Sequence, residues 1–265
     1  MDLFKKRCIF GLQWACETLV PMAPAQKIQM IRLVFRFFLG LWLFSLALTL
    51  LYRWVPIPFT PLMFIRLMEE PQEGQAHRWY RDWVPLEQIS PHLIQAAVAT
   101  EDQHFMEHHG FDFEALQRAY RRNQKGNKRM LGGSTISQQT AKNIFLWPAR
   151  NYLRKGLEAY FTVTIELLWS KQRIMEVYLN SIEMGPGIYG AEAASQAYFH
   201  KSAADLSKRQ AALLVAAFPN PRQRNPGQPS PYMRRRASKI QRLMRQIGPV
   251  HLDQPGSSTG PQSSR

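Results

Sequence analysis

The longest apolar stretch of the chain lies close to its N-terminus. Residues 37–52 carry no charge, and the wider span from 31 to 55 is long enough for a helix to cross about 30 Å of hydrocarbon. Arg32 and Arg36 reach the interface at one end, and Trp54 does so at the other. A buried core helix seldom lacks a polar face over four turns, and no small-residue site for signal-peptide cleavage follows. The pattern therefore predicts one transmembrane helix.

The composition of the chain and the spacing of its apolar residues change twice after this span. Residues 56–90 are rich in Pro and Trp and indicate a membrane-proximal connector. Apolar positions then recur at helical spacing, and no stretch alternates with the period of a strand. The segments with helical spacing are 92–108, 112–123, 134–146, 153–169, 171–180 and 205–218. The pattern predicts an all-α domain over 91–246, followed by a disordered tail over 247–265.

Composition and charge narrow the class of protein. The 265 residues are 45% hydrophobic and 20% charged, which is too apolar for a disordered chain, and the two cysteines exclude a disulfide scaffold. With 34 Lys and Arg against 19 Asp and Glu, the net charge is +15. The excess lies in three blocks: residues 1–36, and the acid-free runs 115–157 and 219–246. Nucleic acid, anionic lipid headgroups and pyrophosphate are the polyanions that fit such blocks.

The flanks of the apolar span predict its orientation. The N-terminal segment, residues 1–30, is basic, whereas the basic residues after the span are soon followed by acidic ones. The positive-inside rule places the N-terminus in the cytoplasm and everything from about residue 56 outside, in the periplasm of a bacterium. Cys8 and Cys16 then lie on the reducing side, in agreement with their being unpaired. A nucleic-acid partner is disfavoured, because the basic domain is exported.

The first helical segment after the connector carries a pair of acids. Glu101, Phe105 and His108 are spaced to share one face, with Asp102 beside them and Gly110 after the helix. Taken alone, acids on a helix are most often solvated surface. A metal site at His104 and His108 is an alternative, but the run HFMEHH lacks the HExxH spacing of zinc hydrolases.

A glycine pair precedes the next helical segment. Gly132 and Gly133 free the backbone, and either Ser134 or Thr135 can cap the helix that follows. Exposed N–H groups, hydroxyls and a lysine at a helix start favour an anion site, although an ordinary capped helix fits the same residues.

The acid-free run around this helix favours the anion site. It ends in Arg150, Arg154 and Lys155, and Glu158 follows on the same helical face as Arg154. Two carboxylates on either side of a cationic segment suit glycosidic chemistry with a phosphorylated leaving group. A hydrolase of neutral glycan does not need ten cations beside its acids, whereas a transferase from a lipid-linked sugar pyrophosphate does.

Five stretches resemble, in order, the motifs of the peptidoglycan glycosyltransferases shared by class A penicillin-binding proteins and monofunctional biosynthetic transglycosylases. They are TEDQHFMEHHGFD, GGSTISQQTAKN, RKGLE, SKQRIMEVYLN with GIYGAEAASQAYF, and LLVAAFPNPRQRNP. They cover about residues 90–226. The S-x-x-K and K-T-G motifs of a transpeptidase do not occur, so the chain is similar to the monofunctional branch.

The resemblance implies a lysozyme-like helical head with a smaller, membrane-facing jaw, and a hexosyltransferase that joins lipid II to a growing glycan strand. Undecaprenyl pyrophosphate leaves, and the anomeric carbon is inverted to a β-1,4 linkage. Glu101 is implied as the general base, and Glu158 as the residue that positions cations or a divalent ion. The residues implied in substrate binding are Asp102, Phe105, His108, Gly133, Ser134, Thr135, Gln138, Gln139, Lys142, Asn143, Arg150, Arg154 and Lys155.

The resemblance also implies partners and a place in the cell. Mg²⁺ or Mn²⁺ is typical of the family, but the sequence offers no clear ligand set, and no organic cofactor is expected. Lipid II, the glycan strand, membrane lipid and proteins of cell-wall synthesis or division are the expected partners. The expected location is the bacterial inner membrane, with a single pass and a periplasmic catalytic domain.

Two other functions fit parts of the pattern. A lysozyme-like lytic enzyme shares the fold class and a catalytic glutamate, and a non-catalytic adaptor would use its basic patches to bind anionic lipid. Several residues also have structural interpretations: Phe105, Tyr178 and Leu179 as core, Asn180 as a cap or a contact, and Glu166 and Glu176 as helix surface. The run 219–246 has no assigned partner.

Overall fold

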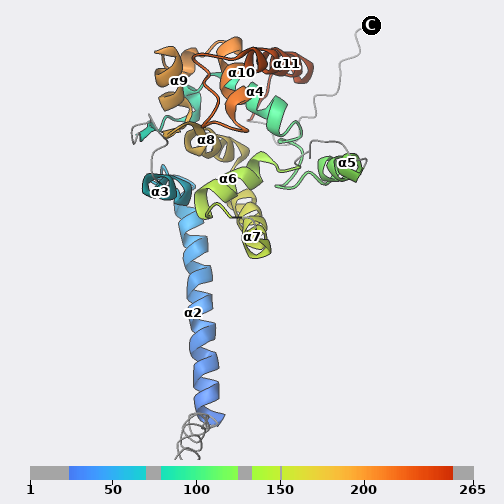
Figure 1. The fold of residues 1–265 in the computed structure, drawn as a ribbon. Helices are drawn as coiled ribbons and strands as arrows, with labels where there is room; N and C mark the ends of the chain where they lie inside the picture. Colours follow the sequence, from blue (N-terminus) through green and yellow to red (C-terminus); the bar gives the residue numbers. More distant parts are fainter. Residues whose placement is uncertain (1–23, 70–78, 125–132, 150, 253–265) are drawn as a thin grey trace, which may run out of the picture. The chain divides into compact units, whose positions relative to one another are not determined.

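The computed structural model describes residues 24–69, 79–124, 133–149 and 151–252 (Figure 1). The chain divides into two compact units between Leu48 and Thr49. Most of helix α2 (Pro24–Leu51) belongs to the first unit, and the remaining elements belong to the second.

Helix α2 has the length and surface expected of a membrane anchor. Its 28 residues span about 42 Å at 1.5 Å per residue, and it is apolar enough to cross a bilayer. Phe35, Phe38 and Phe44 are each more than 60% exposed, so apolar side chains point outward around the helix. Such a surface is stable in lipid and costly in water. The helix ends at Leu51, four residues before the end of the predicted span.

The second unit is built from helices, as the sequence predicts. Six of them correspond to the six segments with helical spacing, whereas α3, α9 and α11 were not predicted. The helices are α3 (Pro61–Met68), α4 (Pro91–Glu101), α5 (Phe113–Gln124), α6 (Ile136–Phe145), α7 (Tyr152–Leu168), α8 (Lys171–Ser181), α9 (Ala191–Phe199), α10 (Lys208–Ala217) and α11 (Pro231–Ile247), with short 3₁₀ turns at Leu86–Gln88 and Ala203–Asp205. The all-α prediction is confirmed.

Most of these helices begin at a residue that the sequence marks. Helices α3, α4 and α11 start with a Ser or Thr cap followed by Pro, whose fixed φ suits the first helical position. Helix α10 begins with a capping box between Ser207 and Gln210, in which each side chain bonds to the other residue's backbone. These local signals fix the starts of the helices that surround the site.

A small sheet accompanies the helices. Strands β1 (Tyr80–Arg81), β2 (Glu183–Gly185) and β3 (Ile188–Tyr189) lie in the order β1-β3-β2. β1 is parallel to β3, and β2 is antiparallel to it. Strands of two or three residues are too short to produce an alternating pattern, which explains why the sequence did not predict them.

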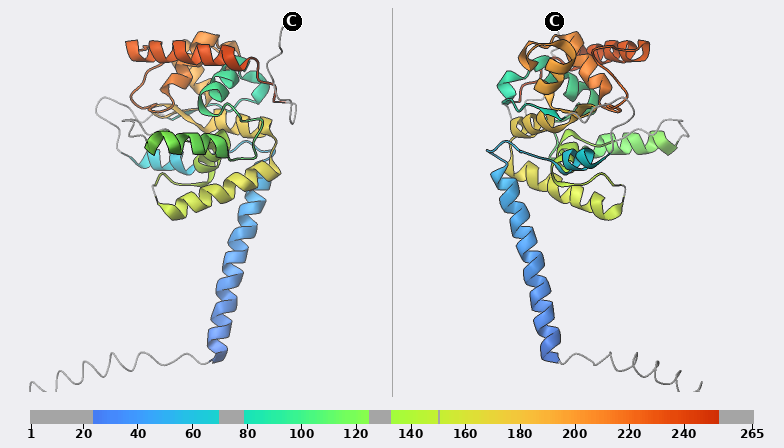
Figure 2. Two further views of the ribbon diagram at one scale, coloured as in Figure 1. Left: turned by 90° about the vertical axis from the view of Figure 1, so that its right-hand side faces the viewer. Right: turned by 60° about the vertical axis from the view of Figure 1, so that its left-hand side comes forward.

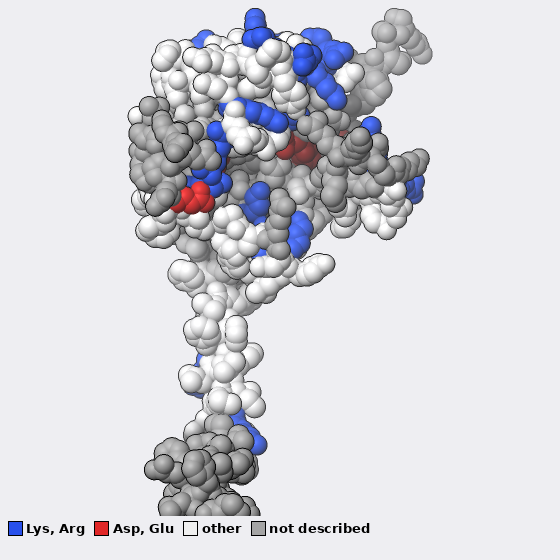
Figure 3. Space-filling view, in the orientation of Figure 1, with Lys and Arg blue, Asp and Glu red and all other residues white. Residues whose placement is uncertain are grey.

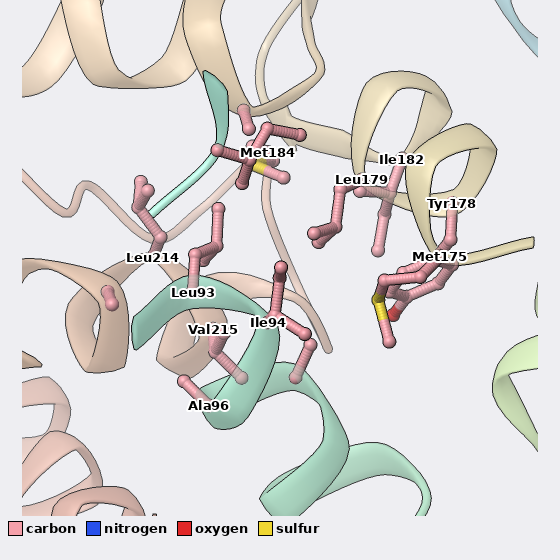
Figure 4. Packing of buried hydrophobic residues seen from close by; sticks show 14 of the residues in the cluster. Leu93, Ile94, Ala96, Met175, Tyr178, Leu179, Ile182, Met184, Leu214 and Val215 are labelled. Atoms are coloured by element: carbon pink, nitrogen blue, oxygen red, sulfur yellow. The ribbon is translucent and has the colours of Figure 1, made fainter. Parts of the chain in front are cut away.

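The core of the second unit lies where α4, α8 and α10 meet (Figure 4). Leu93 of α4, Leu179 of α8 and Leu214 of α10 are fully buried and face one another. Tyr178 is also buried, as predicted for it and for Leu179. Many positions of α4 and α10 are alanine, so the two backbones approach closely.

The helices of this unit are arranged in layers (Figures 1 and 2). Helices α4, α9, α10 and α11 form one layer, α8 lies beneath it, and α6 and α7 lie on the far side of α8. Helix α5 projects from the body of the unit in both figures. The larger layer with α8 corresponds to the expected lysozyme-like head, and α6 and α7 to the expected jaw.

The connector is tied to α8 by buried polar groups. Asn180 is fully buried, and its side-chain amide donates to the Val84 carbonyl at 2.9 Å while its Oδ1 accepts from the Val84 N–H at 3.0 Å. Its role is therefore structural. Glu176 is half-buried, accepting from Arg173 at 2.6 Å and from the Trp83 indole at 3.3 Å, so its prediction as surface was wrong.

Candidate active site

Helix α4 ends at Glu101, and the chain turns sharply at the next residue. Asp102 leaves helical geometry with φ −161° and ψ 82°, and its Oδ2 accepts the backbone N–H of Ile136 at 2.9 Å. The prediction that Phe105 and His108 share a helical face with Glu101 was therefore wrong. The competing bond to the first turn of α6 ends α4 early and joins the two helices.

Asp102 and His108 form a buried pair behind this turn. His108 Nε2 lies 2.9 Å from Asp102 Oδ1, and the Gly110 N–H donates to His108 Nδ1 at 3.1 Å. Since Nδ1 accepts, the neutral ring carries its proton on Nε2 and donates it to the carboxylate. His104 instead lies 2.7 Å from Glu107. Both histidines of the alternative metal site thus have other partners.

Gly110 occupies a position that only glycine fits. Its φ is +90°, and a Cβ there would lie 2.8 Å from Cγ2 of Thr162. Its carbonyl accepts the Thr135 hydroxyl at 2.6 Å. The turn after Asp102 is thereby fixed against the start of α6.

Thr135, not Ser134, caps α6. Its Oγ1 accepts the Gln138 N–H at 3.2 Å, and Gln138 Oε1 accepts the Thr135 N–H at 3.0 Å. This capping box leaves the Ser134 side chain exposed. Gly133 is described beside it, whereas Gly132 lies outside the described residues.

Glu101 is half-buried and held by one neighbour of α6. Gln139 Nε2 donates to its Oε2 at 3.1 Å, and Gln139 Oε1 in turn accepts from the Tyr178 hydroxyl at 3.4 Å. Burial raises the pKa of the Glu101 carboxyl, while the Gln139 bond and the positive charges of Arg236 and Lys142 lower it. A carboxyl with a raised pKa, facing a cleft, is suited to take a proton from a substrate.

The first turn of α7 presents cations around a buried acid. Glu158 is 3% exposed, and its Oε2 accepts from Arg154 Nη1 at 3.0 Å while its Oε1 pairs with Lys155. The predicted shared face of Arg154 and Glu158 is confirmed. Removal of water from around the Lys142 ammonium lowers its pKa, and the negative charge of Glu158 raises it. The positive charges of Arg154 and Lys155 lower the pKa further. Arg150 lies outside the described residues.

Two pockets adjoin at Glu101. The cation pocket has a volume of about 360 Å³, and the polar pocket about 180 Å³. The cation pocket is lined by Glu101, Ser134, Gln138, Gln139, Lys142, Arg154, Lys155, Glu158, Ile182, Phe218 and Pro219. The polar pocket is lined by Thr100, Glu101, Asp102, Gln103, His104, Asp112, Ala115, Arg118, Gly133, Ser134 and Thr135. Among the residues that the structure describes, Glu101 and Ser134 line both.

Three predicted site residues line neither pocket. Phe105 is fully buried, and the Lys171 ammonium lies 4.6 Å from its ring centroid. Phe105 is therefore a core residue, as the structural interpretation of the sequence predicts. His108 supports Asp102, and Asn143 lies half-buried one turn beyond Gln139.

Two functional candidates were missed by the sequence. Arg118 of α5 lines the polar pocket, and Arg236 of α11 stands near enough to Glu101 to lower its pKa. Both belong to basic runs, but nothing in the spacing shows that α5 borders the polar pocket or that α11 packs against α4. Figure 3 shows basic side chains spread over one face of the second unit, with two small, separate acidic patches among them.

A second buried ion pair lies behind the site. Lys171 Nζ donates to Glu166 Oε1 at 2.8 Å and to the His108 carbonyl at 2.7 Å, and the Ser137 hydroxyl donates to the same glutamate oxygen. The Glu166 side chain is 6% exposed, so its prediction as helix surface was wrong. The pair joins α6, α7 and α8 to the turn after Asp102.

The fold and this site define a class of protein: a helical protein with an apolar N-terminal helix and, in its second unit, a half-buried carboxyl beside a pocket lined by cations. A family model described as Transglycosylase matches residues 69–245. The chain belongs to this family, as the motifs predict, and is a peptidoglycan transglycosylase, a glycosyltransferase.

Similar proteins have the same curated description, "Biosynthetic peptidoglycan transglycosylase". The Bdellovibrio bacteriovorus protein is 51% identical over 206 residues, covering 78% of this chain and 81% of its own. The Caulobacter vibrioides protein is 56% identical over 191 residues, covering 72% and 80% respectively. The Bacteroides thetaiotaomicron protein is 50% identical over 218 residues, covering 81% and 88%.

Proposed function

We propose that this transglycosylase polymerises lipid II into β-1,4-linked glycan strands and releases undecaprenyl pyrophosphate. The observation that carries the proposal is the place of Glu101, shared by a cation-lined pocket and a polar one. A transferase needs two substrate sites that meet at one base, whereas a hydrolase needs only water at the second. The growing strand is the donor in the cation pocket, and lipid II is the acceptor in the polar pocket.

Glu101 acts as the general base. The acceptor's 4-hydroxyl oxygen forms a bond to the donor's anomeric carbon while that carbon's bond to the pyrophosphate oxygen breaks, and Glu101 takes the hydroxyl proton. Attack from the side opposite the leaving group inverts the anomeric carbon. A positioned base contributes about 10²–10⁴-fold in rate. The bond from Gln139 directs the carboxylate toward the acceptor.

The cation pocket stabilises the leaving pyrophosphate. Lys142, Arg154 and Lys155 line it and supply positive charge where negative charge develops. Glu158 holds Arg154 and Lys155 in place without being free to attack a sugar. Ser134, Gln138 and Arg150 are the remaining proposed pyrophosphate ligands of this stretch.

The residues that the structure describes do not form a divalent-cation site. Within the described ranges, no three His, Cys, Asp or Glu residues come together to hold a metal ion. Both oxygens of Glu158 already accept from cations. The proposed steps therefore use the protein's own cations.

The proposed setting is the bacterial inner membrane. Helix α2 supports a single anchor, with residues 1–30 cytoplasmic, 31–55 spanning, 56–90 connecting and 91–246 catalytic in the periplasm. A tail over 247–265 follows. Substrate and product both carry the prenyl lipid of that membrane, and proteins of cell-wall synthesis or division are the expected protein partners.

The test replaces the base. Glu101→Gln keeps the bond partner of Gln139 but cannot take a proton, so labelled lipid II should give at least 100-fold less polymer. Glu107→Gln is the matched control, because Glu107 is exposed and lines neither pocket. Substantial polymer from Glu101→Gln would overturn the proposal. Soluble fragments from finished cell wall would favour a lytic enzyme, and unchanged cellular function a non-catalytic adaptor.

A further inference from the structure

Helix α5 presents two different faces. Phe113, Leu116 and Tyr120 recur at the spacing of one helical face, whereas Ala115 and Arg118 lie on another that borders the polar pocket. Since α5 projects from the body of the unit (Figures 1 and 2), its apolar face is not covered by the core. This face is not explained by the proposed catalytic steps.

The apolar face lines a groove, here called the α5 groove. Its volume is about 690 Å³, and its walls are Phe113, Glu114, Leu116, Gln117, Ala119, Tyr120 and Gly133. Phe113 is 73% exposed, Leu116 54% and Tyr120 64%. Large apolar side chains grouped in this way on one helix mark a binding surface more often than scattered single ones do.

The α5 groove adjoins the polar pocket at Gly133. Gly133 lines both, and it lies so close to α5 that a Cβ would come within 3.2 Å of the Leu116 Cα. Only backbone thus separates the two hollows at this point. A single ligand with a polar end and an apolar end can therefore occupy both.

We propose that the α5 groove binds the polyprenyl chain of the acceptor substrate, at the end nearest its pyrophosphate. The inference rests on the proposed function, which places the acceptor's sugar in the polar pocket. An acceptor of this class carries a long apolar chain that must leave the polar pocket somewhere. The α5 groove offers an apolar path that begins at the pocket wall, with Arg118 on the same helix at the polar end.

The experiment measures how strongly the enzyme prefers long-chain acceptors. The KM for lipid II with its natural chain is compared with the KM for an analogue in which a methyl group replaces the whole prenyl chain, so that the part nearest the pyrophosphate is also missing. In Phe113→Ser and Tyr120→Ser, the ratio of the analogue's KM to that of lipid II should fall about tenfold, because the long chain loses apolar contacts. A ratio equal to that of the unsubstituted enzyme would overturn the inference.

Leu167→Ser on α7 is the matched control. Leu167 is 79% exposed and lines none of the three hollows, so it removes apolar surface without touching the α5 groove. Its KM ratio should equal that of the unsubstituted enzyme. An equal fall in Leu167→Ser and the α5 variants would mean that α5 only contacts membrane or detergent, and the inference would be wrong. Thermal unfolding of each variant confirms that it is folded.

The two proposals fail in different ways. If the unsubstituted enzyme makes no polymer from either lipid, the proposed function fails. If it polymerises both and the α5 variants keep its chain-length preference, only the assignment of the α5 groove fails. A photoreactive group on the first isoprene units of lipid II should also label residues of 113–120, and labelling confined to other helices would contradict the assignment.

Discussion

At the scale of single residues, Glu101 is subject to opposing influences. Burial has the largest effect and raises its pKa. The hydrogen bond from Gln139, the charge of Arg236 and the charge of Lys142 each lower it, in decreasing order of size. A base works only when deprotonated, so activity is lost as the pH falls through this raised pKa. The acid limb of the rate profile therefore reports the surroundings of one carboxyl.

Removing the Gln139 bond should move that limb. Gln139→Ala takes away a hydrogen bond that favours the ionised carboxylate, so the pKa of Glu101 rises further and the acid limb shifts to higher pH. The measurement is kcat for lipid II polymerisation between about pH 4 and 9. Gln246→Ala, exposed on α11, is the control. An acid limb that stays in place in Gln139→Ala would show that another group titrates.

The lowered pKa of Lys142 predicts how the rate of polymerisation falls at alkaline pH. Its lowered pKa means that its charge is lost at a lower pH than for an ordinary lysine, which weakens pyrophosphate binding. Arginine stays protonated throughout, so Lys142→Arg should move the alkaline limb of kcat/KM to higher pH, even if the maximum falls. Identical alkaline limbs in the two enzymes would rule out Lys142 as the titrating group.

At the scale of elements, the start of α6 organises the site. Asp102 accepts from its first N–H, Thr135 caps it and bonds to Gly110, and Ser137 donates to Glu166. Each bond joins α6 to a different segment. The position of Gln139 against Glu101 follows from these attachments, so changes behind the site should affect catalysis through α6.

The Lys171–Glu166 pair tests this attachment. Lys171→Met leaves the nearly buried Glu166 with the Ser137 hydroxyl as its one hydrogen-bond partner among the described residues, and we expect a loss of about 3 kcal/mol in unfolding free energy. Glu166→Gln added to Lys171→Met removes the unpaired charge and should recover part of the loss. Denaturant unfolding monitored by tryptophan fluorescence measures both. A double variant less stable than Lys171→Met would contradict the argument.

The sequence predicted some elements and not others for physical reasons. Helices α4, α6, α7, α8 and α10 bury apolar residues, whereas α5 exposes its apolar face, and in all of them the helical period is visible in the residues. Helix α11 buries Met233, Ala237, Ile240 and Met244, which recur at helical spacing among many basic residues, so its period is present in the sequence although the prediction did not include it. The early end of α4 was unpredictable because Asp102 bonds to Ile136, a residue distant in sequence.

The same distinction holds within the candidate site. Glu101, Lys142, Arg154 and Glu158 were found because their local spacing and charge are visible along the chain. Arg118 and Arg236 depend on where α5 and α11 lie, and local pattern does not contain that information.

At the scale of the whole molecule, the net charge of +15 separates into several tasks. The N-terminal block is expected to set the orientation of the membrane helix, and the block 115–157 supplies the cations that line the cation pocket. The block 219–246 divides further: Arg236 acts on Glu101, whereas most of the other cations of α11 are exposed. Arg236 is therefore the cation of that helix that we expect to affect the chemistry.

The difference between Arg236 and the exposed cations of α11 predicts different pH profiles for two variants of this helix. Arg236→Gln removes a charge that lowers the pKa of Glu101, so the acid limb should shift to higher pH. A quadruple Gln variant of exposed cations should leave that limb and kcat unchanged; its positions are Arg235, Lys239, Arg242 and Arg245. The pH profiles of lipid II polymerisation compare them at constant ionic strength. An equal shift in both variants would mean that Glu101 responds to the whole cationic surface of α11, because long-range charge and not the neighbouring guanidinium would then set its pKa.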